Sequence, residues 1–373
     1  MAEVEIGMGK SARRAYELDD LSIVPSRRTR DPEQVDISWE IDAFRFELPL
    51  MASAMDGVVS PARAVEIGRL GGVGVLNLEG LWTRYDDPGP VLEEIAALPD
   101  GDPRATVARM RELYAPPIDH DLIAQRIKEI RAAGVVAAGA VTPQGTESLI
   151  DAVVKAEPDL LVIQGTVVSA EHVSTDDEEP LNLKTFVRRL DLPVIVGGCS
   201  SYQAALHLMR TGAAGVLVGV GSGRSSRTRQ VLGMGVPSAT AVADARSARM
   251  RHLDETGVYV QVIADGGMAS GGDIAKAIVC GADAVMLGAP LAATEGAPGR
   301  GWHWGPAAAH ATTPRSSRVQ VGCAGTLEQV LVGPAPAPLG RANLFGALRR
   351  TMALTGHRTV KDLQKAELVV TTG

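Results

Sequence analysis

The sequence is poor in aromatic residues and in cysteines, and both shortages exclude classes of protein. Aromatic residues make up only 3% of the 373 residues while 45% are hydrophobic, so a core must consist mainly of Ala, Val, Ile and Leu. The three cysteines, Cys199, Cys280 and Cys323, form no CxxC pair, which excludes the usual zinc and redox motifs. Such sparse cysteines are typical of a reducing compartment, and we expect a cytoplasmic protein.

The sequence also lacks an excess of positive charge and any long apolar run. Its formal net charge is −7, which argues against a broad basic face for nucleic acid or for an anionic membrane. No apolar stretch approaches the ~20 residues of a membrane-spanning helix. The first residues are acidic, unlike a secretory signal peptide. We therefore expect no nucleic-acid partner and no membrane partner.

Short apolar segments alternate with segments of helical periodicity along the chain. The apolar segments are rich in Val, Ile and Leu without regular alternation, which is typical of buried parallel strands. They cover residues 48–52, 73–76, 135–141, 160–163, 193–196, 215–218, 259–264 and 284–287. Helices are expected between them, for example at residues 122–133, 147–156, 202–211, 239–255 and 272–280.

Eight strands alternating with helices predict an α/β fold, a single (β/α)8 TIM barrel over residues 1–373 with its strands within 48–288. The alternative is an open doubly wound sheet, which is less favoured because no GxGxxG follows the first strand. Residues 78–121 are expected to form a short helical connection. Residues 296–340, rich in Gly, Pro and Ala, predict a flap-like excursion that serves as a lid or an oligomer contact. A C-terminal helix and tail are expected at 341–373.

Glycine-rich turns follow three neighbouring strands of the predicted barrel. They read GVGSGR at residues 219–224, ADGG at 264–267 and MLGA at 286–289. Active sites of such barrels lie at the C-terminal strand ends, and glycine lets backbone N–H groups approach a phosphate. We predict a phosphate site formed by Gly266, Gly267, Gly288 and residues 221–224, with Asp265 accepting from ribose hydroxyls. The alternative is that these glycines only form tight turns.

Motifs along most of the chain resemble those of the IMP dehydrogenase/GMP reductase family. Residues 16–26 (YELDDLSIVPS) are similar to the family's opening motif, residues 53–56 (SAMD) to its SxMD, and residues 235–241 (GVPSATA) to its GxPQxTA. The resemblance implies a barrel that binds a purine nucleotide (IMP, XMP or GMP) with NAD and potassium, and that forms a homotetramer or larger assembly. Residues 78–121 are too few for the CBS pair that most members carry there, so the chain is most similar to the CBS-lacking branch.

The resemblance also implies roles for individual residues. The nucleotide would contact Ser53, Met55, Asp265, Gly267 and Gly288, and the potassium loop would comprise Gly221, Gly223 and Ser226. Gln164, followed by Gly165 and Thr166, stands at the end of the fourth strand, where the family has an aspartate on the nicotinamide side.

The chain departs from the family pattern at the nucleophile. Ser226 occupies the position of the catalytic cysteine, while Thr228 remains at the position of the catalytic threonine. A serine hydroxyl needs an adjacent base to become a nucleophile, and none is near in sequence. Cys199, just beyond the fifth strand, is an alternative nucleophile, although a packed small residue is the more favoured interpretation.

A second departure lies on the same loop. Arg224 replaces the family's phosphate-binding serine, and with Arg227 and Arg229 it forms a basic loop on an acidic protein. Its planar guanidinium is suited to phosphate, but a solvated loop is an equal alternative. Leu217 and Ala324 also differ from the family pattern.

Three functions are compatible with this pattern. The first is an NAD-dependent oxidoreductase that converts IMP to XMP in guanine nucleotide synthesis. The second is a non-catalytic, regulatory purine-nucleotide-binding paralogue, which would keep the phosphate and ribose groups and lose the covalent chemistry. The third, GMP reductase, is less favoured because it too depends on the cysteine that Ser226 replaces.

Overall fold

The computed structural model describes residues 3–99, 102–169, 182–226, 228–305, 318–336 and 340–371. Eight parallel strands close into a barrel, each paired with the next and the last with the first. The strands are β6 (Leu50–Ala52), β7 (Val73–Asn77), β8 (Ala138–Val141), β9 (Leu160–Gln164), β10 (Val194–Cys199), β11 (Gly215–Val218), β12 (Gln261–Asp265) and β13 (Ala284–Leu287). The predicted (β/α)8 barrel is confirmed, and the open doubly wound sheet was the wrong alternative.

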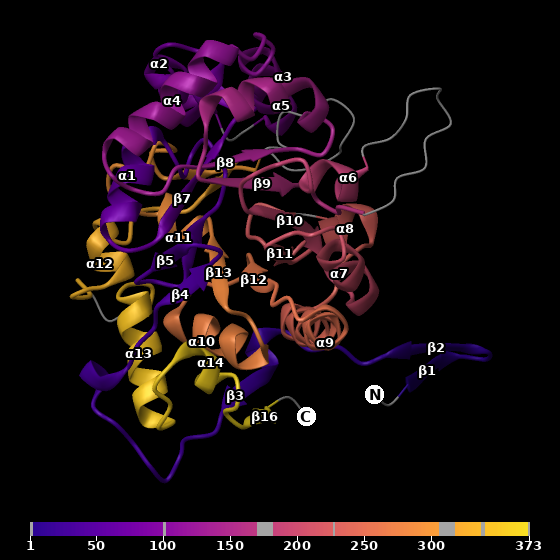
Figure 1. Cartoon of the computed structure of the whole chain (residues 1–373). Coiled ribbons are helices and arrows are strands. Elements are labelled where there is room, and N and C mark those ends of the chain that lie inside the picture. The colour runs from indigo at the N-terminus through magenta and orange to yellow at the C-terminus, as the bar shows by residue number, and fades with distance from the viewer. Residues whose placement is uncertain are drawn as a thin grey trace.

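Helices between the strands surround the barrel (Figure 1). They are α1 (Pro61–Arg69), α4 (His120–Ala132), α5 (Thr146–Ala156), α6 (Leu183–Val187), α7 (Tyr202–Met209), α8 (Thr228–Leu232), α9 (Ser238–Thr256), α10 (Gly271–Cys280) and α11 (Ala289–Ala292). Local sequence fixes where several begin. Ser60 caps α1 ahead of Pro61, and Ser270 and Asp273 form a capping box at the start of α10.

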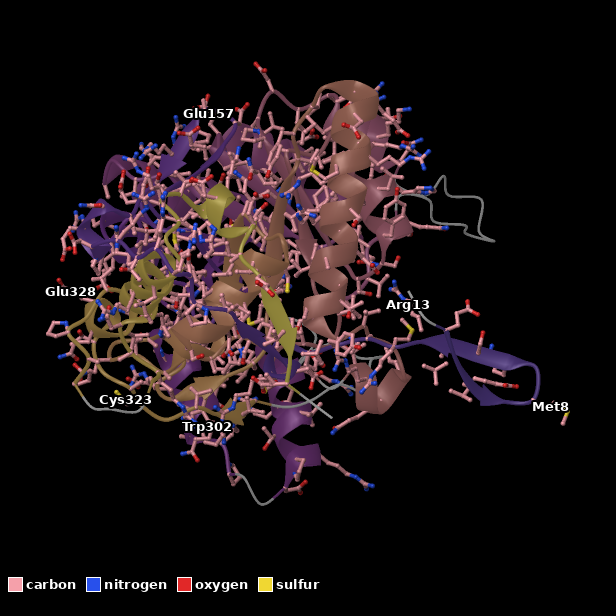
Figure 2. The ribbon with its side chains drawn as sticks, turned by 90° about the horizontal axis from the view of Figure 1, so that it is seen from below. Met8, Arg13, Glu157, Trp302, Cys323 and Glu328 are labelled. Atoms are coloured by element: carbon pink, nitrogen blue, oxygen red, sulfur yellow. The ribbon has the colours of Figure 1, made fainter. Side chains whose placement is uncertain are left out.

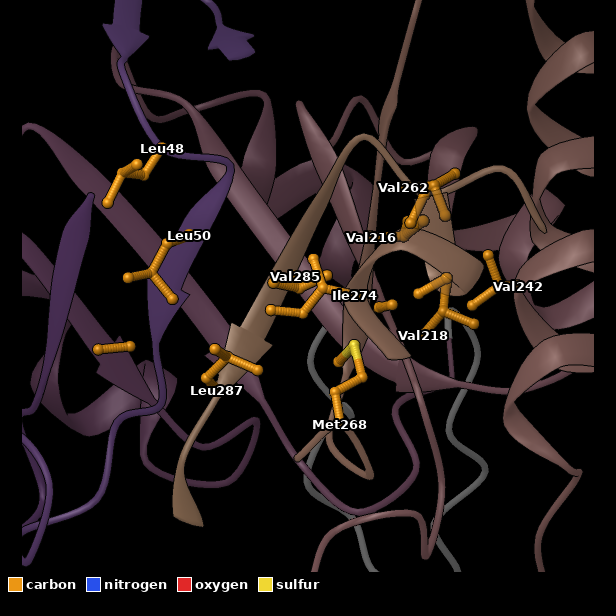
Figure 3. Close-up of a cluster of buried hydrophobic side chains, with 14 of the residues drawn as sticks. Leu48, Leu50, Val216, Val218, Val242, Val262, Met268, Ile274, Val285 and Leu287 are labelled. Carbon is orange, nitrogen blue, oxygen red and sulfur yellow. The ribbon is translucent and has the colours of Figure 1, made fainter. Parts of the chain in front are cut away.

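The strand residues alternate between two buried clusters. One side of the barrel wall faces the interior, where Met51, Val75, Val162 and Met286 belong to one cluster. The other side packs against the helices. Figure 3 shows part of this outer cluster, with Leu50, Val216, Val262 and Val285 from the strands beside Val242 of α9 and Ile274 of α10. Each fully buried aliphatic side chain contributes about 1.5–3 kcal/mol, so the aliphatic composition suffices for the core.

A hairpin that the sequence analysis did not predict packs against the barrel interior. It consists of β4 (Trp39–Ile41) and β5 (Phe44–Phe46), which pair antiparallel. The rings of Trp39 and Phe46 stack with their centroids 5.2 Å apart. Val136 and Ala214, which precede β8 and β11, pack against the same cluster. The hairpin therefore lies at the end of the barrel where the strands begin, which leaves the opposite end for a site.

Residues 78–121 form the expected helical connection between β7 and α4. It contains η3 (Leu81–Thr83), α2 (Gly89–Ala97) and α3 (Pro103–Leu113). The excursion after β13 contains β14 (Trp302–His303), β15 (Val319–Gln320) and α12 (Leu327–Leu331), while residues 306–317 and 337–339 of it lie outside the described residues. The tail holds α13 (Leu344–Leu354) and α14 (Val360–Leu363).

A short strand follows the helices of the tail. β16 (Leu368–Val370) is a strand that pairs antiparallel with β3 (Leu21–Ile23), next to η1 (Leu18–Asp20). The sequence analysis did not predict this strand, because pairing between segments so distant in sequence leaves no local pattern. In the sequence, η2 (Pro32–Gln34) lies between β3 and the hairpin strand β4.

The N-terminal residues form a hairpin that projects away from the barrel (Figures 1 and 2). It consists of β1 (Glu3–Gly7) and β2 (Lys10–Arg13), all of whose residues are exposed, with Met8 at its tip. At its base Arg13 forms an ion pair with Asp244 of α9. No helix among the described residues has the length and apolar character needed to cross a membrane.

Candidate functional site

The predicted site residues meet at the C-terminal ends of the barrel strands. Gln164 ends β9 and Asp265 ends β12, while Gly288 follows β13 directly. β12, β13 and β6 are neighbours in the barrel. Ser53, one residue beyond β6, donates its backbone N–H to the carbonyl oxygen of Leu287 at 2.9 Å. The barrel thus brings together residues that lie far apart in the sequence.

Asp265 is a partly buried acid of this mouth. Its carboxylate accepts one side-chain hydrogen bond, from Gln164 Nε2 at 3.2 Å, and burial raises its pKa to about 6 even though that hydrogen bond opposes the shift. A carboxylate has about four lone-pair sites. Within the described residues, Gln164 is the single donor to this carboxylate, so Asp265 retains the capacity to accept from a ligand.

The glycine-rich loops pack against each other backbone to backbone. Gly266 and Gly267 have φ angles of 79° and 83°, in the left-handed region that favours glycine. A Cβ at Gly266 would lie 3.0 Å from the backbone of Gly223, and one at Gly267 would lie 3.2 Å from the carbonyl oxygen of Ser222. The Ser222 hydroxyl donates to the carbonyl oxygen of Asp265 at 2.6 Å. These glycines therefore also serve loop packing, the alternative raised from the sequence.

A second group surrounds Gly288. A Cβ there would lie 2.9 Å from Cε1 of His303 and 3.3 Å from Oγ of Ser53. Nε2 of His303 lies 3.3 Å from Oγ of Ser225, and both side chains are buried. Met55 is partly buried and packs against the core. Sequence reasoning missed the contact between His303 and Ser225, because His303 belongs to no motif and the two residues are 78 positions apart.

The nucleophile position contains a serine without a base in contact. Oγ of Ser226 lies 3.0 Å from Oγ1 of Thr228, the fully buried first residue of α8. The Ser226 backbone N–H donates to the carbonyl oxygen of Gly223 at 2.9 Å. Among the described residues, the side-chain partner of Ser226 is therefore another hydroxyl, which cannot accept a proton at neutral pH.

The three arginines of the basic loop have different surroundings. Arg224 is exposed, and Arg227 lies outside the described residues. Arg229 is ion-paired with Glu17, which also accepts from the backbone N–H and the hydroxyl of Ser238, both at 2.9 Å. Arg229 therefore ties the N-terminal segment to the start of α9 through Glu17, and its guanidinium is not a solvated group of the basic loop.

Cys199 is a packed residue, as the more favoured interpretation had it. Its side chain is buried, with Sγ 3.5 Å from the carbonyl oxygen of Leu217, and burial raises its pKa to about 12. A thiol needs a low pKa to act as a nucleophile. The structure therefore excludes the alternative nucleophile.

The predicted nicotinamide-side residues follow β9. Gly165 donates its N–H to Gly197 at 2.8 Å and accepts from Gly198 at 2.9 Å, so its backbone is engaged with β10. Thr166 is partly buried. Gln164 donates its amide N–H to Asp265, so its side chain contacts that carboxylate rather than forming a separate surface for the nicotinamide.

The connection between β7 and α4 is tied to the mouth by a buried polar network. Asp56 accepts from the Tyr114 hydroxyl at 2.6 Å and from the Leu81 N–H at 3.1 Å, and burial raises the pKa of its carboxyl to about 6. Tyr114 in turn accepts from Trp304 Nε1 at 2.8 Å. Trp304 directly follows His303, so this network anchors the excursion beside Ser225.

Comparison with known proteins matches this architecture and these motifs. The model of the IMP dehydrogenase/GMP reductase domain matches residues 15–307. This chain belongs to the IMP dehydrogenase/GMP reductase family. An uncharacterized oxidoreductase of Mycolicibacterium smegmatis is 52% identical, over 98% of this chain and 99% of that protein. The inosine-5′-monophosphate dehydrogenase of Methanocaldococcus jannaschii is 26% identical, over 78% of this chain and 74% of that enzyme.

A solved structure supports the same assignment. The crystal structure of an IMP dehydrogenase/GMP reductase-like protein from Corynebacterium glutamicum has a TM-score of 0.93 and 47% sequence identity. It covers 99% of this chain, which covers 97% of that one. The likeness therefore extends over the N-terminal hairpin and the tail as well as the barrel.

Proposed function

We propose that this protein binds a purine 5′-nucleotide of the IMP, XMP or GMP class at the barrel mouth, without the covalent adduct that a cysteine would form. The observation that carries the proposal is Asp265. This partly buried carboxylate has Gln164 as its single donor among the described residues. Leaving a partly buried carboxylate with so few donors is costly, and ribose hydroxyls would supply the missing donors.

The phosphate would bind where the glycine loops meet. Gly267 and Gly288 follow adjacent strands, and their lack of a Cβ lets Ser222 and His303 pack closely against them at the proposed phosphate site. Ser53 and Arg224 would add a hydroxyl and a cation, and Met55 would pack against the base. This division follows the predicted roles of these residues.

The proposed loss of covalent chemistry rests on two side chains. Ser226 contacts a hydroxyl rather than a base, and Cys199 is buried with a raised pKa. Among the described residues, no base contacts this serine to take its proton at neutral pH. Binding and turnover are therefore separated in this site, and a regulatory role in which the protein senses purine nucleotides follows.

A second candidate is NAD-dependent oxidation of IMP to XMP, which family membership favours. Ser226 and Thr228 remain hydrogen-bonded at the positions of the family's catalytic pair. Gln164, Gly165 and Thr166 would hold NAD, which supplies the hydride acceptor, and the carbonyl oxygens of Gly221, Gly223 and Ser226 would hold potassium. The Gly223 carbonyl already accepts the Ser226 N–H, so it offers the cation one remaining lone pair.

Calorimetry with IMP, XMP, GMP and the phosphate-free nucleoside inosine tests the first proposal. We expect micromolar or tighter binding of at least one nucleotide and much weaker binding of inosine. Folded protein that binds none of the three nucleotides would overturn it.

An assay of NADH production from IMP, NAD and potassium separates the two candidates. We expect no NADH above the blank for the natural protein. Sustained turnover would establish the dehydrogenase instead, and NADPH oxidation with GMP would indicate a reductase. Ser226→Cys is the informative variant, because NADH released by it alone would mean that the rest of the catalytic site is intact.

A further inference from the structure

His303 is buried at the mouth although it comes from a segment outside the barrel strands. It comes from β14, in the excursion after the barrel, and its ring reaches back to the backbone of Gly288. Only 2% of the residue is exposed. A Cβ at Gly288 would meet Cε1 of the ring at 2.9 Å, so glycine at this position makes room for the imidazole.

The two ring nitrogens of His303 differ in their hydrogen-bond partners. Nε2 lies 3.3 Å from Oγ of Ser225. Nδ1 is buried and has no hydrogen-bond partner among the described residues. A buried polar atom without a partner costs about 1–3 kcal/mol, so a site that keeps one is expected to offer it to a ligand.

A serine beside a histidine could instead be a nucleophile with its base. That arrangement requires a third group, usually a carboxylate, that orients the histidine through its other nitrogen. Nδ1 lacks such a group within the described part of the chain. Burial, helped by the Arg224 cation, also lowers the pKa of His303 to about 4, which makes it a poor base. The pair therefore fits binding better than catalysis.

We propose that His303 is a ligand for the phosphate of the bound nucleotide, which it holds through Nδ1–H together with the exposed guanidinium of Arg224. This inference rests on the proposed function, because it names further residues of the same site. Ser225 fixes the ring by contacting Nε2, and Gly288 sets how closely the ring approaches the strand end.

The charges around His303 give this binding a dependence on pH. Arg224 is the charged side chain that shifts its pKa, while Ser53, Gly288, Ser225 and the β15 partner Val319 carry none. The adjoining Trp304 leads through Tyr114 to Asp56, whose carboxylate is occupied. A bound phosphate would offset the Arg224 cation and accept from the imidazole, so it would raise the pKa of His303. The protein would then take up a proton when the nucleotide binds.

Calorimetry with IMP and with inosine tests the inference in the natural protein and in His303→Gln, which keeps a neutral polar side chain of similar length. His120→Gln, at an exposed histidine of α4, is the matched control. At pH 6 we expect His303→Gln to weaken IMP binding roughly tenfold, as for the loss of one charge-assisted hydrogen bond. Inosine binding should not change. The control should match the natural protein for both ligands.

Titrations in two buffers of different ionisation enthalpy, at pH 6 and pH 8, measure the proton uptake. We expect the natural protein to take up more protons with IMP at pH 6 than His303→Gln does, and the difference in affinity to shrink at pH 8. Equal IMP affinities and equal proton uptake would overturn the role of His303 and leave the proposed function standing. Equal losses for IMP and inosine would also overturn it, since they indicate a structural role. No IMP binding by the natural protein would overturn both.

Discussion

The two sides of the barrel mouth differ in how they keep the features of the IMP dehydrogenase/GMP reductase family. The ends of β12 and β13 keep the partly buried acid Asp265 and the two glycines Gly267 and Gly288. The loop between β11 and α8 has lost the cysteine, and its Ser226 contacts only another hydroxyl among the described residues. Binding groups and reacting groups can thus change independently, because they are placed by different segments.

The largest expected effect comes from removing the proposed nucleotide-binding group at the end of β12. Asp265→Ala removes the acceptor proposed for two ribose hydroxyls, and should weaken IMP binding roughly a hundredfold, since hydrogen bonds to a charged group contribute about 1.5–3 kcal/mol each. Calorimetry measures it. Asp19→Ala, at an exposed carboxylate, is the control and should bind normally. An unchanged affinity in Asp265→Ala would mean that the nucleotide lies elsewhere.

The carboxylate of Asp265 should also lower the stability of the folded protein at neutral pH. The raised pKa of Asp265, about 6, means that its contribution to stability is greatest below its ordinary pKa near 3.8 and is lost as the pH rises through 6. Relative to the natural protein, Asp265→Asn should therefore gain about 2–3 kcal/mol in unfolding free energy between pH 4 and pH 8. Urea titrations at both pH values measure this gain, and a pH-independent difference would contradict it.

A smaller effect is expected from crowding the strand end. In Gly288→Ala the new Cβ would press on His303 and Ser53, at 2.9 and 3.3 Å, and we expect roughly tenfold weaker IMP binding from the displaced groups. Gly272→Ala is a matched control in α10, where the nearest atom to a Cβ is Ser270 Oγ at 3.6 Å. It should bind normally and gain slightly in stability, as is usual for alanine in a helix. Equal binding by both variants would remove Gly288 from the site.

The smallest effect is expected from substituting Cys199, the alternative nucleophile at the end of β10. Cys199→Ala removes a buried thiol that the proposal excludes from chemistry, so IMP affinity and any NADH production should stay within about twofold, while stability falls by about 1 kcal/mol from the lost packing. Calorimetry and the NADH assay test this together. Loss of an activity present in the natural protein would restore Cys199 as a nucleophile.

The sequence by itself determined the barrel and much of its mouth. Buried parallel strands need continuous apolar segments, and tight strand-to-helix turns need glycine, so both features appear as local patterns. The strands β11 and β13 lie where the patterns predicted them, and Asp265 and Gly288 follow from their positions at strand ends. Ser226 was identified by its place in the family's motif.

Only the tertiary structure decided which groups meet above those strand ends. His303 contacts Ser225 and Gly288, and Tyr114 links Asp56 to Trp304, yet His303, Trp304 and Tyr114 lie in segments with no distinctive local pattern. Long connections return to the mouth through packing and hydrogen bonds between residues distant in sequence. The physical reason is that local propensity fixes strands and turns, whereas the partners of a buried polar group depend on which segments the closed barrel places side by side.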